Sequence, residues 1–257
     1  MSLGDVHLAL WGPSSAGKTM LLAQMYNRWD PRSGWKILTS EVGQVFIDTM
    51  RDWVEARGLF PPPTDPHNPQ EVVYEFRHRE SNQRATLSIE DRAGVDSETL
   101  PDDALDRLNR ANGLILLIDP ERATTRIGWE IIRTLERLHL QSSTDDIDSR
   151  PLAICLSKAD KVIRTVEDLR RAVAEPDTFV RDWIGGSLST ATLDKINTYS
   201  SNHRFFPISS VGVLKRYGVV EQVVFHDEYL TERIRRGGQP LNLEAPFVWI
   251  FEQLGAK

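Results

Sequence analysis

The sequence predicts an α/β fold built on a mostly parallel, doubly wound sheet, and three observations point to it. Strand-like and helix-like segments alternate along most of the 257 residues. The runs GLILLI at 113–118 and PLAICLS at 151–157 are almost entirely apolar, which is typical of parallel strands covered by helices on both faces. A loop of small residues at 12–17 joins a strand to a helix, and ligands of such folds bind at the carboxyl ends of strands.

The first quarter of the chain supplies a strand, a helix and an insertion. The strand is expected at about 5–11, and the helix from Lys18 to about Arg28. Apolar residues recur every three or four positions over 37–57, so this stretch is expected to be a helical insertion. The next stretch, LFPPPTDPHNPQ at 59–70, holds too many prolines for a helix or a central strand, and we expect an exposed loop.

Two strand-like runs then follow each other closely. EVVYEFRHR covers 71–79 and ATLSIED covers 85–91, with five residues between them. A parallel pair would need a crossover of a dozen or more residues. The two runs are therefore expected to form an antiparallel hairpin, with one of its strands at an edge of the sheet.

The remaining segments continue the alternation. We expect helices and strands in turn at 103–111, 113–120, 126–140, 151–157, 166–200 and 204–210. A final helix is expected at 245–254, where Pro246 suits the first turn. One domain over 1–257 is predicted, with its core at about 5–213 and a C-terminal extension at 214–257.

Composition and charge narrow the class of protein. The formal net charge of −6 argues against a general affinity for nucleic acid backbones. The single cysteine, Cys155, excludes an intrachain disulfide and indicates a reducing compartment. No apolar run is long enough to span a bilayer, and neither a secretory segment nor a lipid-attachment signal is evident. A cytoplasmic protein without a direct membrane anchor is expected.

The segment GPSSAGKT at 12–19 matches the phosphate-loop pattern G-x-x-x-x-G-K-[ST] between a strand and a helix. Small residues let the loop curl so that main-chain N–H groups converge on a phosphate, and the helix N-terminus adds positive charge. Lys18 is expected to reach the β- and γ-phosphates, and Thr19 to offer its hydroxyl to Mg²⁺. The alternative is a glycine-rich turn with a surface lysine. The expected phosphate-binding residues are Gly12, Ser14, Ser15, Ala16, Gly17, Lys18, Thr19 and Met20.

The segment LSIEDRAG at 87–94 places an acid at the end of a strand. Asp91 could hold the magnesium through water, and the N–H of Gly94 could contact the γ-phosphate, so that its loop responds to that phosphate. An ordinary turn is the alternative interpretation, because aspartate is common where strands end. The phosphate loop upstream favours the metal site.

Two further strand ends carry candidate base-binding residues. In LSKAD, Asp160 could accept hydrogen bonds from N1–H and the exocyclic amine of guanine, a donor pair that adenine lacks. Lys158 could lay its stem over the base beside Ser157; a helix-capping aspartate is the alternative. In FFPISSVG, the N–H of Ser210 could meet guanine O6, with Ser209 and Val211 next to it.

In this order, the phosphate loop, DRAG, SKAD and ISSV resemble the G-domain of the translation-factor-related (TRAFAC) P-loop GTPases, the class of Ras-like and Arf-like proteins, over about 5–213. The resemblance implies a P-loop NTPase three-layer sandwich with one antiparallel edge strand, which the hairpin would supply. It implies GTP/GDP and Mg²⁺ as ligands. Ser157 departs from the asparagine or threonine that is usual there. GPSSAGKT, the insertion, PPPT and NLEAPFVWIFEQL look similar, more specifically, to bacterial double-GTPase proteins of regulatory and conflict systems.

The resemblance also implies a threonine in the first mobile loop that senses Mg²⁺ and the γ-phosphate. Thr64 in PPPTDP is the better candidate and Thr39 the second. The implied metal ligands are thus Thr19, Thr64 and Asp91, and the implied catalytic residues Lys18, Thr64 and Gly94. Val95 stands where the class often has a glutamine that positions water, so slow hydrolysis is expected.

These features predict a GTP-binding switch with slow, Mg²⁺-dependent hydrolysis that regulates partner proteins. Guanine nucleotide and an effector or activating protein are the expected partners, homodimerisation is left open, and nucleic acid is not expected. A P-loop ATPase or kinase-like enzyme is one alternative, although no arginine-rich lid is evident. A degenerate nucleotide-binding scaffold is another, which Val95 permits and which intact Lys18, Thr19 and Asp91 oppose.

Overall fold

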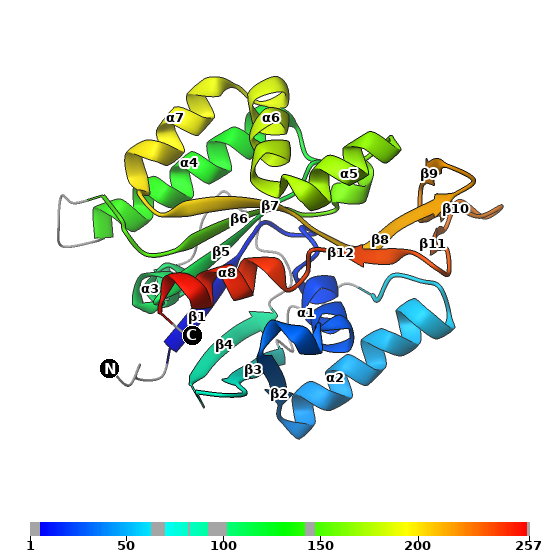
Figure 1. Ribbon diagram of the computed structural model, residues 1–257, viewed down its shortest axis with the longest axis horizontal. Helices are drawn as coiled ribbons and strands as arrows, with labels where there is room; N and C mark the ends of the chain where they lie inside the picture. Colours follow the sequence, from blue (N-terminus) through cyan, green and yellow to red (C-terminus); the bar gives the residue numbers. More distant parts are fainter. Residues whose placement is uncertain (1–5, 63–69, 82, 92–101, 142–146, 256–257) are drawn as a thin grey trace.

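The computed structural model describes residues 6–62, 70–81, 83–91, 102–141 and 147–255. These residues form three layers, a central sheet with helices on both faces (Figure 1). The predicted α/β sandwich is confirmed. None of the described helices combines the length and the apolar character that crossing a bilayer requires.

The central sheet of the described residues has the strand order β2-β3-β4-β1-β5-β6-β7. Its strands are β1 (Val6–Trp11), β2 (Trp35–Thr39), β3 (Gln70–His78), β4 (Arg84–Asp91), β5 (Gly113–Ile118), β6 (Leu152–Leu156) and β7 (His203–Pro207). Neighbours from β4 through β1, β5 and β6 to β7 run parallel. Only β3 in this sheet runs antiparallel to its neighbours, β2 and β4. The carboxyl ends of the other six strands therefore lie at one edge.

The predicted hairpin is confirmed, but its outer strand does not lie at the sheet edge. β3 and β4 pair antiparallel, with Tyr74 opposite Leu87. Outside β3 lies β2, which pairs with it from Trp35 opposite His78 to Thr39 opposite Tyr74. The edge strand is β2, and the antiparallel strand β3 is second from the edge.

The helical prediction for 37–57 is wrong at its start and right afterwards. Its first three residues belong to β2; helix α2 (Glu41–Arg51) and a π-helical turn (Asp52–Ala56) follow. The side chain of Ser40 accepts a hydrogen bond from the main-chain N–H of Gly43, and this cap fixes where the helix begins. The spacing of apolar residues could not locate the boundary, because it does not register the cap.

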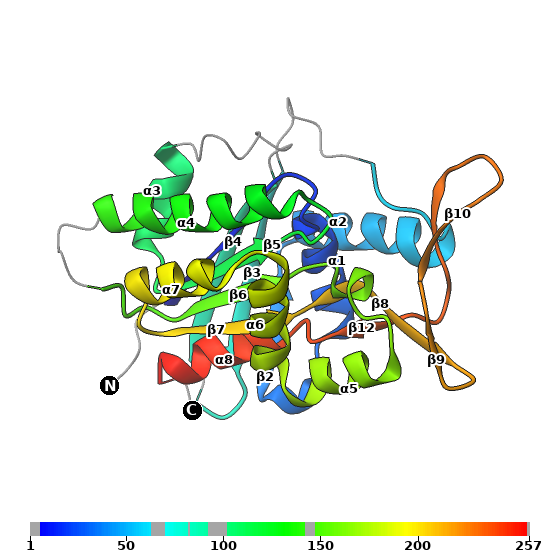
Figure 2. The same cartoon turned by 90° about the horizontal axis from the view of Figure 1, so that it is seen from above.

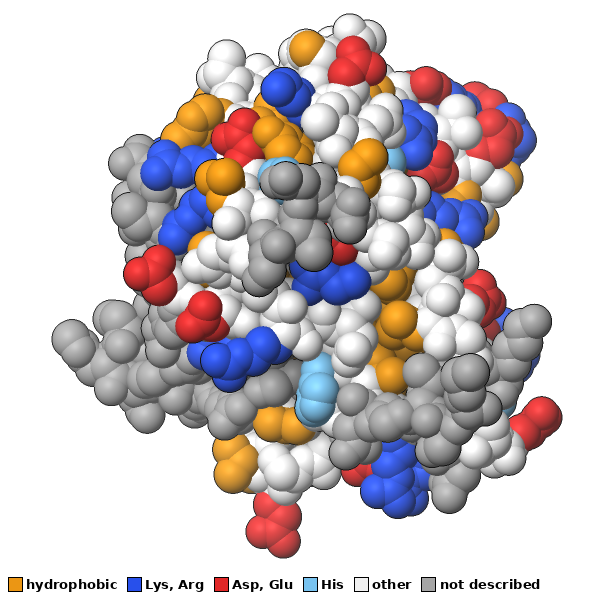
Figure 3. All heavy atoms as spheres, turned by 90° about the vertical axis from the view of Figure 1, so that its left-hand side faces the viewer, with side chains coloured by type: hydrophobic (Ala, Val, Ile, Leu, Met, Phe, Trp, Pro, Cys, Tyr) orange, Lys and Arg blue, Asp and Glu red, His pale blue; other side chains and the backbone are white. Residues whose placement is uncertain are grey.

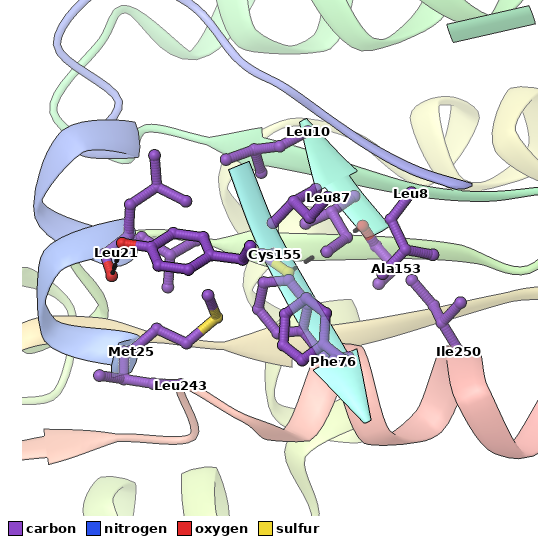
Figure 4. Close-up of a cluster of buried hydrophobic side chains, with 14 of the residues drawn as sticks. Leu8, Leu10, Leu21, Met25, Phe76, Leu87, Ala153, Cys155, Leu243 and Ile250 are labelled. Atoms are coloured by element: carbon purple, nitrogen blue, oxygen red, sulfur yellow. Dashed lines mark hydrogen bonds between the residues drawn. The ribbon is translucent and has the colours of Figure 1, made fainter. Parts of the chain in front are cut away.

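Helices cover both faces of the sheet, and each face has its own hydrophobic core. One face carries α1 (Lys18–Arg28), α2 and α8 (Ala245–Gln253). The other carries α3 (Asp102–Arg110), α4 (Thr124–Gln141), α5 (Val166–Ala174), α6 (Pro176–Ser187) and α7 (Thr190–Tyr199). Figure 4 shows part of the first core, where side chains of α1 and α8 meet those of the central strands.

Beyond β7 the chain forms short strands that project from the body of the molecule (Figure 2). They are β8 (Ser209–Arg216), β9 (Val219–Glu221), β10 (Val224–His226), β11 (Glu232–Ile234) and β12 (Gln239–Leu241). β8 pairs with β9 and β12, and β10 pairs with β11 as a separate hairpin. After β12 the chain returns to the main body and ends in α8.

An aromatic cluster makes α8 part of the core rather than an appendage. Phe247 and Phe251 are almost fully buried. The ring of Phe251 lies 4.1 Å from that of Trp35 on β2 and 5.2 Å from that of Phe76 on β3 (centroid distances). Aromatic pairs at these separations stabilise the fold beyond the burial of their apolar surface. Helix α8 therefore packs against β2 and β3, the two outer strands of the sheet.

Replacing Phe251 by alanine is expected to lower the free energy of unfolding by about 3–5 kcal/mol, because it leaves a cavity in this cluster. Denaturant unfolding followed by circular dichroism measures the change. The neighbouring exposed residue provides the control: Glu252→Ala should change the free energy by less than about 0.5 kcal/mol. Equal stability of the two variants would show that α8 does not anchor the outer strands.

Candidate functional site

The loop between β1 and α1 is curved tightly at the carboxyl edge of the sheet. Ser15 and Gly17 have φ values of 65° and 84°, in the left-handed region that is uncommon for a serine. A Cβ at Gly12 would lie 2.8 Å from the Cβ of Leu117 on β5, so only glycine lets the loop leave β1 this close to β5. A loop of this shape turns successive N–H groups toward one point, where they can bind an anion.

Lys18 folds back over this loop. Its ammonium group donates hydrogen bonds to the carbonyl oxygens of Gly12 and Pro13, at 2.7 and 2.9 Å. Lys18 is also the first residue of α1, whose N-terminal end carries partial positive charge. The loop mouth therefore combines a lysine charge, a helix N-terminus and main-chain donors.

Asp91 is the last residue of β4, the strand that pairs parallel with β1. Leu8 pairs with Leu87, and four residues farther along each chain stand Gly12 and Asp91. Thr19 lines the cavity at the same edge. No group of three or more His, Cys, Asp or Glu in the described residues could hold a metal ion by itself.

The loop after β6 is tied to the end of β5. The N–H and the hydroxyl of Ser157 both donate to the carbonyl oxygen of Ile118, each at 2.8 Å. The hydroxyl thus joins two neighbouring strands. Lys158 follows with φ 49°, and this turn directs the chain into a short 3-10 helix, Ala159–Lys161.

Asp160 in that short helix is a buried carboxylate with one oxygen unsatisfied. Its side chain is 3% exposed. Oδ1 accepts a hydrogen bond from the hydroxyl of Ser209, which in turn accepts one from the N–H of Gly212. Oδ2 is buried and has no hydrogen-bond partner among the described residues. Burial raises the pKa of Asp160, and the Ser209 hydrogen bond offsets this only in part.

Lys158 is held by acids that the sequence analysis did not single out. Its ammonium group donates to Oδ2 of Asp119, which is buried, and to Oε2 of Glu121, at 2.8 and 2.9 Å. Burial alone would lower the pKa of Lys158, but these hydrogen bonds outweigh it and raise the pKa. The available signal was the motif GLILLIDP, where Asp119 directly follows a buried strand.

These loops line one cavity of about 450 Å³. The predicted site residues on its wall are Ser14, Ser15, Ala16, Gly17, Lys18, Thr19, Met20, Ser157, Lys158, Asp160, Ser210 and Val211. Gly12 and Ser209 are buried next to these residues and do not line the cavity. The structure therefore brings the phosphate-loop and base-loop predictions together in a single pocket.

Two further stretches also line the cavity. Phe60, Pro61 and Pro62 follow the helical insertion, and Val224 and Glu232 lie on β10 and β11. The two stretches are more than 150 residues apart in sequence. Pro61 and Pro62 belong to PPPTDP, the segment expected to form the first mobile loop, whereas no motif marks Val224 or Glu232.

Of the residues predicted to sense the γ-phosphate, the structure describes only Thr39. Thr64 and Gly94 lie outside the described residues. Thr39, the second candidate, is the last residue of β2; its hydroxyl donates to the carbonyl oxygen of Val73 at 3.0 Å. Thr39 does not line the cavity.

A mostly parallel sheet with a phosphate loop after β1 defines a P-loop, GTPase-like domain. The model of the Double-GTPase 2 family matches residues 7–206, which is more than half of the chain. The chain belongs to this family, and the similarity to double-GTPases noted from the sequence is confirmed. No curated protein matches the chain.

Asp160→Asn is expected to stabilise the ligand-free protein at neutral pH. Burial raises the pKa of Asp160 in the folded protein above its value in the unfolded chain. The protonated side chain therefore favours folding most below the unfolded pKa, and this contribution to the free energy of unfolding is lost as the pH rises through the folded pKa. Above that range the buried carboxylate opposes folding. An amide should recover about 1 kcal/mol, the scale of an unsatisfied buried polar group.

Thermal unfolding at several pH values measures the effect. The melting temperature of D160N should exceed that of the wild type at pH 7.5, and the difference should shrink as the pH is lowered. The exposed Asp194→Asn variant is the control and should follow the wild type. A D160N protein that melts below the wild type at every pH would contradict the prediction.

Proposed function

We propose that the chain binds GTP and GDP with Mg²⁺ in this cavity, hydrolyses GTP slowly, and acts as a switch for an effector or activating protein. The supporting observation is that the phosphate loop and the buried carboxylate of Asp160 line one pocket. The proposal treats 1–257 as a single G-domain of the TRAFAC type, with the stretch 214–257 as an extension of it.

The phosphate end would hold the β- and γ-phosphates through the loop N–H groups and Lys18. The lysine now donates to two neutral carbonyl oxygens. Exchange of these for phosphate oxygens would add the attraction between opposite charges to each hydrogen bond. The lysine is therefore poised at the point where the charge of the ligand is highest.

The base end would select guanine. Guanine presents N1–H and an exocyclic amine as two adjacent donors, and Oδ2 of Asp160 lacks a partner among the described residues. Adenine would bring an acceptor nitrogen against the carboxylate and leave it unsatisfied. Asp119 and Glu121 hold Lys158 beside this position, so its stem can cover one face of the base.

Thr19 and Asp91 would hold Mg²⁺, with Thr64 as a third ligand, as the sequence indicates. Mg²⁺ supplies neutralisation of phosphate charge in such sites. Thr64 and Gly94 would contact the γ-phosphate and lose that contact after hydrolysis, which is the usual origin of switching. The net charge of −6 and the mixed acidic and basic side chains on the face in Figure 3 favour a protein partner over nucleic acid. A cytoplasmic location and homodimerisation remain part of the proposal.

Isothermal titration should show tight binding of GTP and GDP and at least about 100-fold weaker binding of ATP, because the adenine edge leaves Asp160 unpaired. Asp160→Ala should lose the preference for guanine. Asp160→Asn should favour xanthosine diphosphate, whose 2-oxo group accepts from the new amide. Lys18→Ala should weaken every nucleotide, with Lys195→Ala as an exposed control on α7. Equal affinities for ATP and GTP would end the guanine assignment in favour of an ATPase.

Single-turnover hydrolysis by the purified protein should proceed at on the order of 10⁻³ per second, the range of G-domains without an activating partner. Val95 stands where glutamine often positions water, so Val95→Gln should raise the rate, and Val95→Ala is its control. Mg²⁺ removal with a chelator should abolish turnover. Turnover at many per second by the wild type would contradict slow hydrolysis, and no turnover by any variant would favour the scaffold interpretation.

A further inference from the structure

The β10–β11 hairpin supplies a wall of the cavity that the phosphate and base loops leave unexplained. Val224 and Glu232 line the cavity. Val224 lies directly opposite Ile234 in the antiparallel register. Alternate residues of a strand share a face, so Glu232 lies on the same face of the hairpin as Ile234 and Val224. That face is turned toward the nucleotide pocket.

Main-chain hydrogen bonds fix the hairpin to the segment that enters the pocket. The N–H of Ile234 donates to the carbonyl oxygen of Gly58 at 2.8 Å, and Leu59 and Arg233 form an antiparallel bridge. The chain continues from Leu59 directly into Phe60, which also lines the cavity. The hairpin and this segment therefore form one continuous side of the pocket.

A small hydrophobic cluster joins the same hairpin to the phosphate-loop helix. Its buried members are Met20, Val54, Leu214, Val223 and Ile234. Met20 follows Thr19 in α1, so the cluster fixes the distance between the phosphate loop and β11. A side chain on β11 that faces the pocket is thus held in a defined position relative to bound phosphate.

Glu232 is the acid of the cavity wall that has no partner in the described structure. Glu121 is paired with Lys158 and Lys161, and Asp160 accepts a hydrogen bond from Ser209. Its main chain pairs with His226 in the β10–β11 ladder, but its carboxylate makes no hydrogen bond or ion pair with any described residue. Its carboxylate is an acceptor that can take up to about four hydrogen bonds, and it adds a negative charge to the wall of the pocket.

This charge determines which part of a nucleotide can face Glu232. Phosphate groups would be repelled and lie at the lysine end, beside Lys18. The base edge lies at Asp160, and Lys158 is beside it. The sugar is the remaining part; it is uncharged and carries hydroxyl donors, which a carboxylate accepts readily. An acid that accepts from ribose hydroxyls is a known solution in dinucleotide-binding folds.

We propose that Glu232 accepts a hydrogen bond from the sugar hydroxyls of the bound nucleotide, and that the β10–β11 hairpin thereby selects ribonucleotides over deoxyribonucleotides. This inference rests on the proposed nucleotide function. It assigns a specificity role to a part of the chain beyond residue 206, the last residue that the family model matches.

Titration with GDP, 2′-deoxy-GDP and 2′,3′-dideoxy-GDP tests the proposal. The wild type should bind GDP about tenfold more tightly than either analogue, the lower end of what a hydrogen bond to a charged group contributes. Glu232→Ala should bind GDP more weakly and both analogues unchanged, so that each ratio falls to about one. Glu228→Ala is the matched control: Glu228 is an exposed acid in the turn of the same hairpin and does not line the cavity.

The outcomes separate the two proposals. If the wild type binds GDP and its dideoxy analogue equally, or if Glu232→Ala keeps the tenfold ratio, the sugar-binding role is overturned and the nucleotide function stands. If the wild type binds no guanine nucleotide, the nucleotide function fails and this inference with it. A full ratio in Glu228→Ala together with a lost ratio in Glu232→Ala supports the proposal. Glu232 is exposed, so its replacement should leave the fold intact, which circular dichroism checks.

Discussion

The parallel pairing of β1, β5, β6 and β7 is the constraint on which the site depends. Trp11 pairs with Leu116, Ile118 with Leu156, and Leu156 with Pro207. Because these strands share a direction and a register, the loops that follow them leave the sheet at one level. The phosphate loop, the Asp119 turn and the Asp160 turn are neighbours for this reason, although about 150 residues separate the first from the last.

The charged groups at this edge are arranged in two different ways. Lys158 has two acidic partners, and its position is fixed before any ligand is bound. Asp160 has a buried oxygen without a partner in the described structure, and burial raises its pKa. A group of this kind lowers the stability of the ligand-free protein and gains most from a ligand with matching donors. Perturbed pKa values of this origin are typical of functional sites.

The remaining wall comes from parts of the chain that flank the common core. The segment after α2 and the β10–β11 hairpin are joined by main-chain hydrogen bonds and by the cluster around Ile234. Neither forms part of the central sheet, yet both contact the pocket. The insertion and the C-terminal strands therefore form one wall of the pocket. After these strands, α8 packs into the core through Phe247 and Phe251.

The sequence by itself determined the sheet class, the hairpin, the phosphate loop and the order of the strand-end motifs. These are local features: continuous apolar runs, a short connection and a spaced glycine-lysine pattern each act within about ten residues. Only the tertiary structure decided that β2 forms the edge, that Asp119 holds Lys158, and that Glu232 lines the pocket. Those three depend on contacts between residues far apart in the chain, and no local pattern of hydrophobicity or charge encodes which distant partner a strand or a side chain will meet.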